Sequence, residues 1–102
     1  MDISYSLLGS DHLNLLKDLE NNKNHFTSIH FDMTDNYFCE TLGLSILTLE
    51  QLASTTAFKI DVHLLVERAG YVLRRIENLR INSVTFHLET FSHQKFNGLN
   101  NN

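Results

Sequence analysis

The feature of this chain that most restricts its fold is a regular alternation of short β-type runs with helical patterns. Apolar or β-branched runs predict strands at residues 3–8, 26–31, 57–62 with a continuation to 66, and 83–88. Between them, apolar residues at helical spacing predict helices over 11–22, 45–54 and 69–79. The order β-α-β-α-β-α-β predicts an α/β fold made of parallel β/α units, either a barrel or an open doubly wound sheet.

Two of these helices carry a recognisable start signal. Asp11 and Ser45 each stand before a helical pattern, where their side-chain oxygens can accept a hydrogen bond from a free backbone N–H. In the first helix one apolar face is expected to be buried, formed by Leu13, Leu15, Leu16 and Leu19.

Composition narrows the class of protein without indicating a chemistry. The 102 residues suffice for one small domain, which we place at residues 1–96, with an Asn-rich tail at 97–102 that we expect to be disordered. A net charge of −4 without a basic run argues against nucleic acid, and no apolar stretch is long enough for a membrane span. Residues 1–4 lack the features of a signal peptide, and a lone cysteine suits a reducing compartment, so a cytoplasmic location is expected.

Polar side chains stand at the ends of the predicted strands, where a parallel sheet would bury them. His30 and Asp32 lie two residues apart and therefore share one face of their strand, and His63 occupies the next strand along the chain. In a barrel this face points inward at the mouth that carries active sites. Two imidazoles and a carboxylate suit zinc, iron, manganese or cobalt. The alternative to a metal site is that these histidines are structural residues that form hydrogen bonds within the protein.

Other polar residues give weaker signals. His87 and Glu89 either line the same mouth or pair with neighbouring groups, and Ser6 is most simply a buried hydroxyl bonded to the backbone. Cys39 is expected to fill apolar space, because no base is arranged around it. Three further histidines are expected at the surface: His12, His25 and His93.

Three motifs, in order and at matching spacing, resemble those of the ribulose-phosphate 3-epimerase family. Residues 3–8 followed by Asp11 (ISYSLL…D) resemble the opening I-S-P-S-L-L-x-x-D. Residues 29–38 (IHFDMTDNYF) resemble I-H-x-D-x-M-D-G-H-F, and residues 61–66 (DVHLLV) resemble D-V-H-L-M-V. The nearer branch resembles allulose-6-phosphate 3-epimerase, since residues 84–90 (VTFHLET) are similar to I-T-L-H-P-E-T.

The resemblance implies the N-terminal half of a TIM (β/α)8 barrel, with four strands and about three helices. It implies a metal-dependent ketose-phosphate 3-epimerase that inverts carbon 3 of ribulose-5-phosphate or allulose-6-phosphate through an enediolate. His30, Asp32 and His63 would then be ligands of a divalent metal, zinc, iron, manganese or cobalt. Asp32 would also be an acid/base catalyst, and Ser6 would lie near the substrate.

The chain also departs from the family pattern. The family's second acid, on its seventh strand, and its phosphate-binding loops have no counterpart here, and Thr34 and Leu65 stand where the family has methionines. Met33 should face away from the site. Four strands cannot close a barrel, so we expect two open sheet edges and one uncovered apolar face. The chain is therefore expected to be a truncated form that is inactive alone, unless a homo-oligomer completes the barrel; the alternative is a non-catalytic remnant or interaction module.

Overall fold

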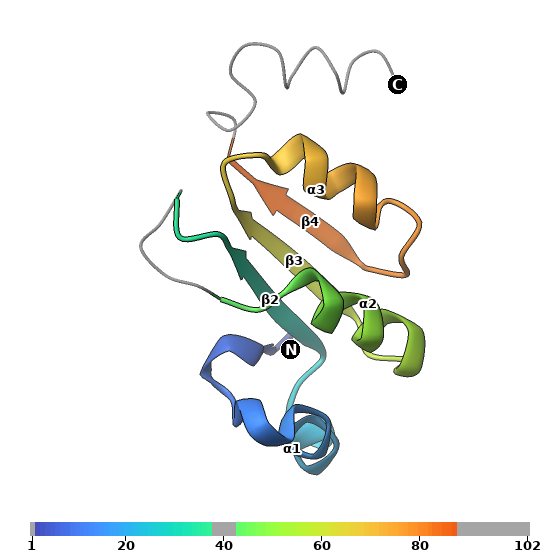
Figure 1. Ribbon diagram of the computed structural model, residues 1–102. Helices are drawn as coiled ribbons and strands as arrows, with labels where there is room; N and C mark the ends of the chain where they lie inside the picture. The colour runs from blue at the N-terminus through green and yellow to red at the C-terminus, as the bar shows by residue number, and fades with distance from the viewer. Residues whose placement is uncertain (1, 38–42, 88–102) are drawn as a thin grey trace.

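Four parallel strands form a single sheet in the computed structural model, which describes residues 2–37 and 43–87 (Figure 1). Their order in the sheet is their order in the chain. They are β1 (Ser4–Ser6), β2 (Ser28–Thr34), β3 (Ile60–Leu65) and β4 (Ser83–Phe86). Each pair of neighbours is parallel, so each connection crosses over the sheet, as in successive units of a (β/α)8 barrel. The predicted α/β class and the half-barrel arrangement are confirmed.

A helix lies in each of the three connections. They are α1 (Leu15–Asn22), α2 (Ile46–Thr55) and α3 (Ala69–Ile76), with short 3-10 segments η1 (Leu7–Gly9), η2 (His12–Asn14) and η3 (Lys23–His25). Both predicted caps are present, because Asp11 accepts from the backbone N–H of Leu13 and Ser45 from that of Thr48. All helices in residues 2–37 and 43–87 are too short to cross a membrane.

One face of the sheet packs against these helices and forms the core. Alternation along the strands sends Ile29, Phe31 and Met33 of β2 to this face, together with Ile60, Val62 and Leu64 of β3. The helices contribute Leu19, Leu49 and Ile76 to the same cluster. Burial of each such side chain stabilises the fold by about 1.5–3 kcal/mol. Met33 belongs to this buried face, so the prediction that it points away from the polar residues is confirmed.

The opposite face of the sheet is polar, so the prediction of an uncovered apolar face was wrong. The strand register places Ser6 beside His30, Asp32 beside His63, and His63 beside Thr85. Further along the same face the register aligns Ser4 with Ser28 and Asp61 with Ser83. The physical reason is the strict alternation of side chains: apolar residues occupy one set of positions, and polar residues occupy most of the other.

The first β/α unit differs from the prediction in two ways. Its strand ends at Ser6, because residues 7–9 turn into a 3-10 helix in which Leu7 is fully buried. Leu13 and Leu16 were expected in the core but are 94% and 52% exposed. The segment starts as a 3-10 turn, with three residues per turn, and becomes α-helical only at Leu15, so the four leucines do not share one face.

Several predictions lie outside the described residues. They concern the domain boundary at residue 96, the tail at 97–102, and the side chains of Cys39, Glu89 and His93.

Candidate metal centre

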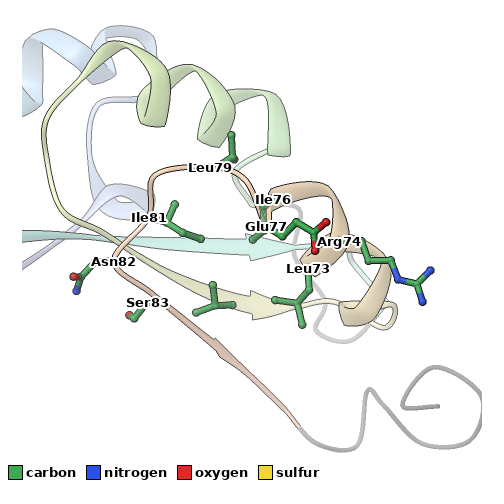
Figure 2. A pocket seen from close by; sticks show the side chains of 9 residues that line it. Leu73, Arg74, Ile76, Glu77, Leu79, Ile81, Asn82 and Ser83 are labelled. Atoms are coloured by element: carbon green, nitrogen blue, oxygen red, sulfur yellow. The ribbon is translucent and has the colours of Figure 1, made fainter. Parts of the chain in front are cut away.

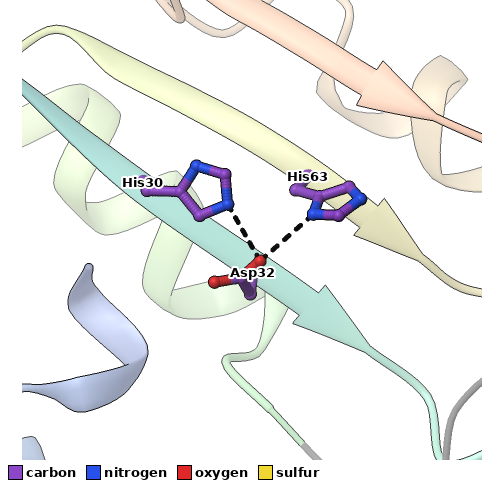
Figure 3. A group of neighbouring side chains, drawn as sticks. All are labelled: His30, Asp32 and His63. Carbon is purple, nitrogen blue, oxygen red and sulfur yellow. Dashed lines mark hydrogen bonds and ion pairs between the residues drawn. The ribbon is translucent and has the colours of Figure 1, made fainter. Parts of the chain in front are cut away.

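The pairing of β2 with β3 brings the three predicted ligands together. His30 and Asp32 occupy alternate positions of β2 and therefore share its polar face. In the register of the two strands Asp32 lies directly beside His63 of β3. Side-chain alternation along each strand determines which face a residue occupies, and the register between the strands determines which residues lie next to one another. Figure 3 shows both imidazoles directed at the carboxylate between them.

The contacts in this cluster converge on one oxygen atom. Oδ1 of Asp32 is 3.0 Å from Nε2 of His30 and 3.3 Å from Nδ1 of His63. The two rings meet edge to face, with centroids 5.7 Å apart. Side-chain exposure is 39% for His30, 15% for Asp32 and 25% for His63, so the cluster is partly sheltered yet open to a small molecule.

This donor set fits a divalent cation. One ligand atom from each residue lies within 4.8 Å of the others. Imidazole nitrogen and carboxylate oxygen are ligands of zinc, iron, manganese and cobalt. Three protein ligands on an open face leave coordination positions for water or a substrate oxygen, which is how catalytic metal sites differ from closed structural ones. The hypothesis of a metal site is thus compatible with the geometry, and the donor set does not select one metal.

The end of β2 is tied to the connection that follows β3. Oδ2 of Asp35 accepts a hydrogen bond from the backbone N–H of Glu67 at 2.8 Å, and its Oδ1 accepts one from Tyr37 N at 2.9 Å. Asn36 between them has a φ of 66°, in the left-handed region that asparagine tolerates better than most residues. This explains how Asn36 can stand where the family motif has glycine. Sequence reasoning gave Asp35 no role of its own.

The chain packs tightly against the same end of β2 at Gly43. A Cβ on Gly43 would lie 2.6 Å from Oγ1 of Thr34 and 3.2 Å from the carbonyl oxygen of Asp32. Thr34 is buried, and within the described residues its Oγ1 has no hydrogen-bond partner. Glycine is needed here for close approach, and the sequence contained no signal for this contact.

Ser6 and His87 both lie beside the cluster. Ser6 of β1 pairs with His30 in the sheet, but it is exposed, so the prediction of a buried hydroxyl was wrong. The strand ends at Ser6, and the helices in residues 2–37 and 43–87 pack on the other face of the sheet, which leaves the side chain open. Nε2 of His87 lies 3.1 Å from Nε2 of His63. Of the two roles predicted for His87, the structure therefore shows the pairing with a neighbouring group, and that group is a member of the cluster. His12 and His25 are exposed, as predicted.

A second polar group lies on the same face at the opposite end of β3. Oδ1 of Asp61 accepts hydrogen bonds from Oγ of Ser83 at 2.6 Å and from Nδ2 of Asn82 at 2.8 Å. These bonds, from Ser83 first and Asn82 second, hold the pKa of Asp61 below its usual value, because they stabilise the carboxylate. Asp61 therefore remains ionised on the polar face, where it links β3 to β4.

A hollow of about 400 Å³ lies on the other side of the sheet, between α3 and β4 (Figure 2). Its lining is largely apolar and includes Leu73, Ile76, Leu79, Ile81 and Val84. Val84 pairs with the buried Val62, which places this hollow on the helix-covered face. It is therefore separate from the metal-capable cluster.

Known proteins are similar to this chain over the whole region that the structure describes. Residues 2–98 match the Ribulose-phosphate 3 epimerase family. A ribulose-phosphate 3-epimerase of Helicobacter pylori (strain ATCC 700392 / 26695) is 28% identical over 93 residues, which cover 91% of this chain and 42% of that protein. One from Buchnera aphidicola subsp. Baizongia pistaciae (strain Bp) is 29% identical over 93 residues, covering 88% of this chain and 38% of that protein. The chain spans about two fifths of the length of these curated relatives.

Proposed function

Because the chain belongs to the ribulose-phosphate 3-epimerase family, we propose that it acts on carbon 3 of a ketose phosphate, with ribulose 5-phosphate as the first candidate substrate. The observation that carries this proposal is the convergence of His30, Asp32 and His63 on the polar face of the sheet. Allulose 6-phosphate is the second candidate, because residues 84–90 resemble that branch of the family.

Asp32 is the residue to which we assign the proton transfer. The hydrogen on carbon 3 lies next to the ketose carbonyl and is too weakly acidic to be removed by an unassisted carboxylate. When bound by His30, Asp32 and His63, a divalent metal would supply positive charge that offsets the charge developing on the sugar oxygens. Both imidazoles contact Oδ1 of Asp32, so we assign the proton from carbon 3 to Oδ2.

Ser6 is proposed to contact the substrate. It is exposed, lies on the same face as the cluster, and is paired with His30 across the β1–β2 ladder. A hydroxyl there can both donate and accept a hydrogen bond, which suits the hydroxyl groups of a sugar phosphate.

Removal of a proton and inversion of carbon 3 make different demands on the site. Removal and return of the proton on one face require one base, whereas inversion requires a second acid on the other face of the planar intermediate. Asp32 is the carboxylate of the cluster in the described residues. The proposed function is therefore tested first by exchange and only then by epimerisation.

The experiment measures solvent deuterium entering carbon 3 of ribulose 5-phosphate and allulose 6-phosphate, by NMR, with zinc or manganese added to the full chain. We expect exchange in the wild type and a loss of at least about 100-fold in Asp32→Asn, since a positioned base typically contributes 10²–10⁴-fold. Asp2→Asn makes the same chemical change at an exposed position and should exchange like the wild type. No exchange with either substrate, or equal exchange in Asp32→Asn, would refute the proposal.

A further inference from the structure

His63 engages both of its ring nitrogens. Nδ1 lies 3.3 Å from Oδ1 of Asp32, and Nε2 lies 3.1 Å from Nε2 of His87. The rings of His63 and His87 are 5.3 Å apart between centroids and inclined by 32°. His63 thus lies between the carboxylate of Asp32 on β2 and the imidazole of His87, which comes directly after β4.

The strand register explains why His87 reaches this place. His63 pairs with Thr85 across the β3–β4 ladder, and His87 lies two residues further along. A separation of two residues keeps His87 on the polar face, and the parallel direction carries it toward the mouth of the sheet. Its contact with His63 therefore follows from backbone pairing.

The two nitrogens in this contact can form a hydrogen bond only if one carries the proton and the other offers a lone pair. For Nδ1 of His63 to bind a metal, that nitrogen must be unprotonated, so neutral His63 carries its proton on Nε2. We propose that His87 accepts this proton in a hydrogen bond at its own Nε2 and thereby fixes the tautomer and ring orientation of His63. This inference rests on the metal site proposed above and adds to it a positioning residue.

The geometry argues that His87 acts through His63 and is not a fourth ligand. The metal-capable set in residues 2–37 and 43–87 consists of His30, Asp32 and His63, and His87 is not part of it. His87 meets the nitrogen of His63 that points away from Asp32. A partner at the second nitrogen of a ligating histidine is the usual outer-shell arrangement, and its removal typically lowers metal affinity about 10–100-fold.

The test compares His87→Phe, which keeps a ring but removes the acceptor, with His87→Gln, whose side-chain oxygen can accept the same hydrogen bond. We expect the zinc affinity of the chain, measured by competition with a chelating dye, to fall about 10–100-fold in His87→Phe. It should stay close to the wild-type value in His87→Gln. His25→Phe makes the same change at an exposed histidine away from the cluster and should leave the affinity unchanged.

A second readout follows the tautomer directly, through the imidazole ¹⁵N shifts of His63. In the zinc-bound wild type we expect the proton on Nε2 of His63, hydrogen-bonded to His87, and in zinc-bound His87→Phe we expect the Nε2 shift to change because that acceptor is lost. Wild-type affinity together with unchanged shifts in His87→Phe would overturn the inference. So would a loss as complete as that in His63→Ala, which would make His87 a ligand.

The two proposals can fail separately. If the wild-type chain binds no zinc, the metal site is refuted, while the metal-free ¹⁵N spectrum still decides whether His63 and His87 share a proton. If His87→Phe does not fold, as judged by circular dichroism, the zinc-bound wild-type spectrum decides, because a His63 Nε2–H that shows no ¹⁵N–¹⁵N coupling across a hydrogen bond to Nε2 of His87 contradicts the inference.

Discussion

Thr34 offers a test of packing beside the cluster, because its hydroxyl is buried without a hydrogen-bond partner in the described residues. Leaving a buried polar group unsatisfied costs about 1–3 kcal/mol. Valine has nearly the same shape and the same preference for strands, so Thr34→Val removes this cost. The gain is limited because the methyl group that replaces the hydroxyl is larger and must fit beside Gly43. We expect a net gain of about 1 kcal/mol, or about 4–8 °C in the midpoint of thermal unfolding for a domain of this size.

Thr27→Val is the matched control, because the same chemical change there removes satisfied hydrogen bonds. Oγ1 of Thr27 accepts from Ile3 N at 2.9 Å and donates to Ile3 O at 3.0 Å. Their loss should lower the free energy of unfolding by about 1 kcal/mol. Both variants are compared with the wild type by urea and thermal unfolding followed by circular dichroism. If Thr34→Val is destabilised as much as Thr27→Val, the hydroxyl of Thr34 has a partner and our reasoning is wrong.

Three further predictions concern stability. Gly43→Ala should cost about 1–3 kcal/mol, because its Cβ would lie 2.6 Å from Oγ1 of Thr34, and the added change Thr34→Ala should recover part of it; urea unfolding of the single and the double variant checks this. Leu49→Ala, at a fully buried position, should cost about 2–5 kcal/mol, whereas the exposed Leu47→Ala on the same helix should cost under about 0.5; similar losses would contradict the assignment of the core. The lowered pKa of Asp61 stabilises the fold above the unfolded pKa of about 3.9, and this contribution is lost as pH falls through the folded value. The urea midpoint of the wild type should therefore fall more steeply in acid than that of Asp61→Asn, and parallel pH profiles would refute this.

The fold could be predicted from the sequence because its signals are local. The strand and helix patterns can each be recognised within a short stretch of sequence, and side-chain periodicity assigns each residue to a face. That sufficed to place His30, Asp32 and His63 on one polar face and Met33 on the other. It failed at Leu13 and Leu16, because a 3-10 start shifts the helical phase in a way that apolar spacing does not reveal.

The contacts around the site could not be predicted because they depend on tertiary pairing. The distance between His63 and His87 follows from the β3–β4 register, which no local pattern specifies. Likewise, Gly43 meets Thr34 only once the chain has returned across the end of β2. The alternation of side chains along the strands does indicate that the face carrying His30 and Asp32 is polar. The prediction of an uncovered apolar face failed because it rested on the incomplete barrel and not on this alternation.

The most direct test of the metal site is a calorimetric zinc titration of the full chain and of variants at each proposed ligand. We expect one zinc per chain in the wild type, with affinity reduced at least about tenfold in His30→Ala, Asp32→Ala and His63→Ala. His25→Ala, at an exposed position, should bind like the wild type. A single site that depends on all three residues is the predicted result; zinc binding that is absent, or that is unchanged in the three variants, would contradict the account.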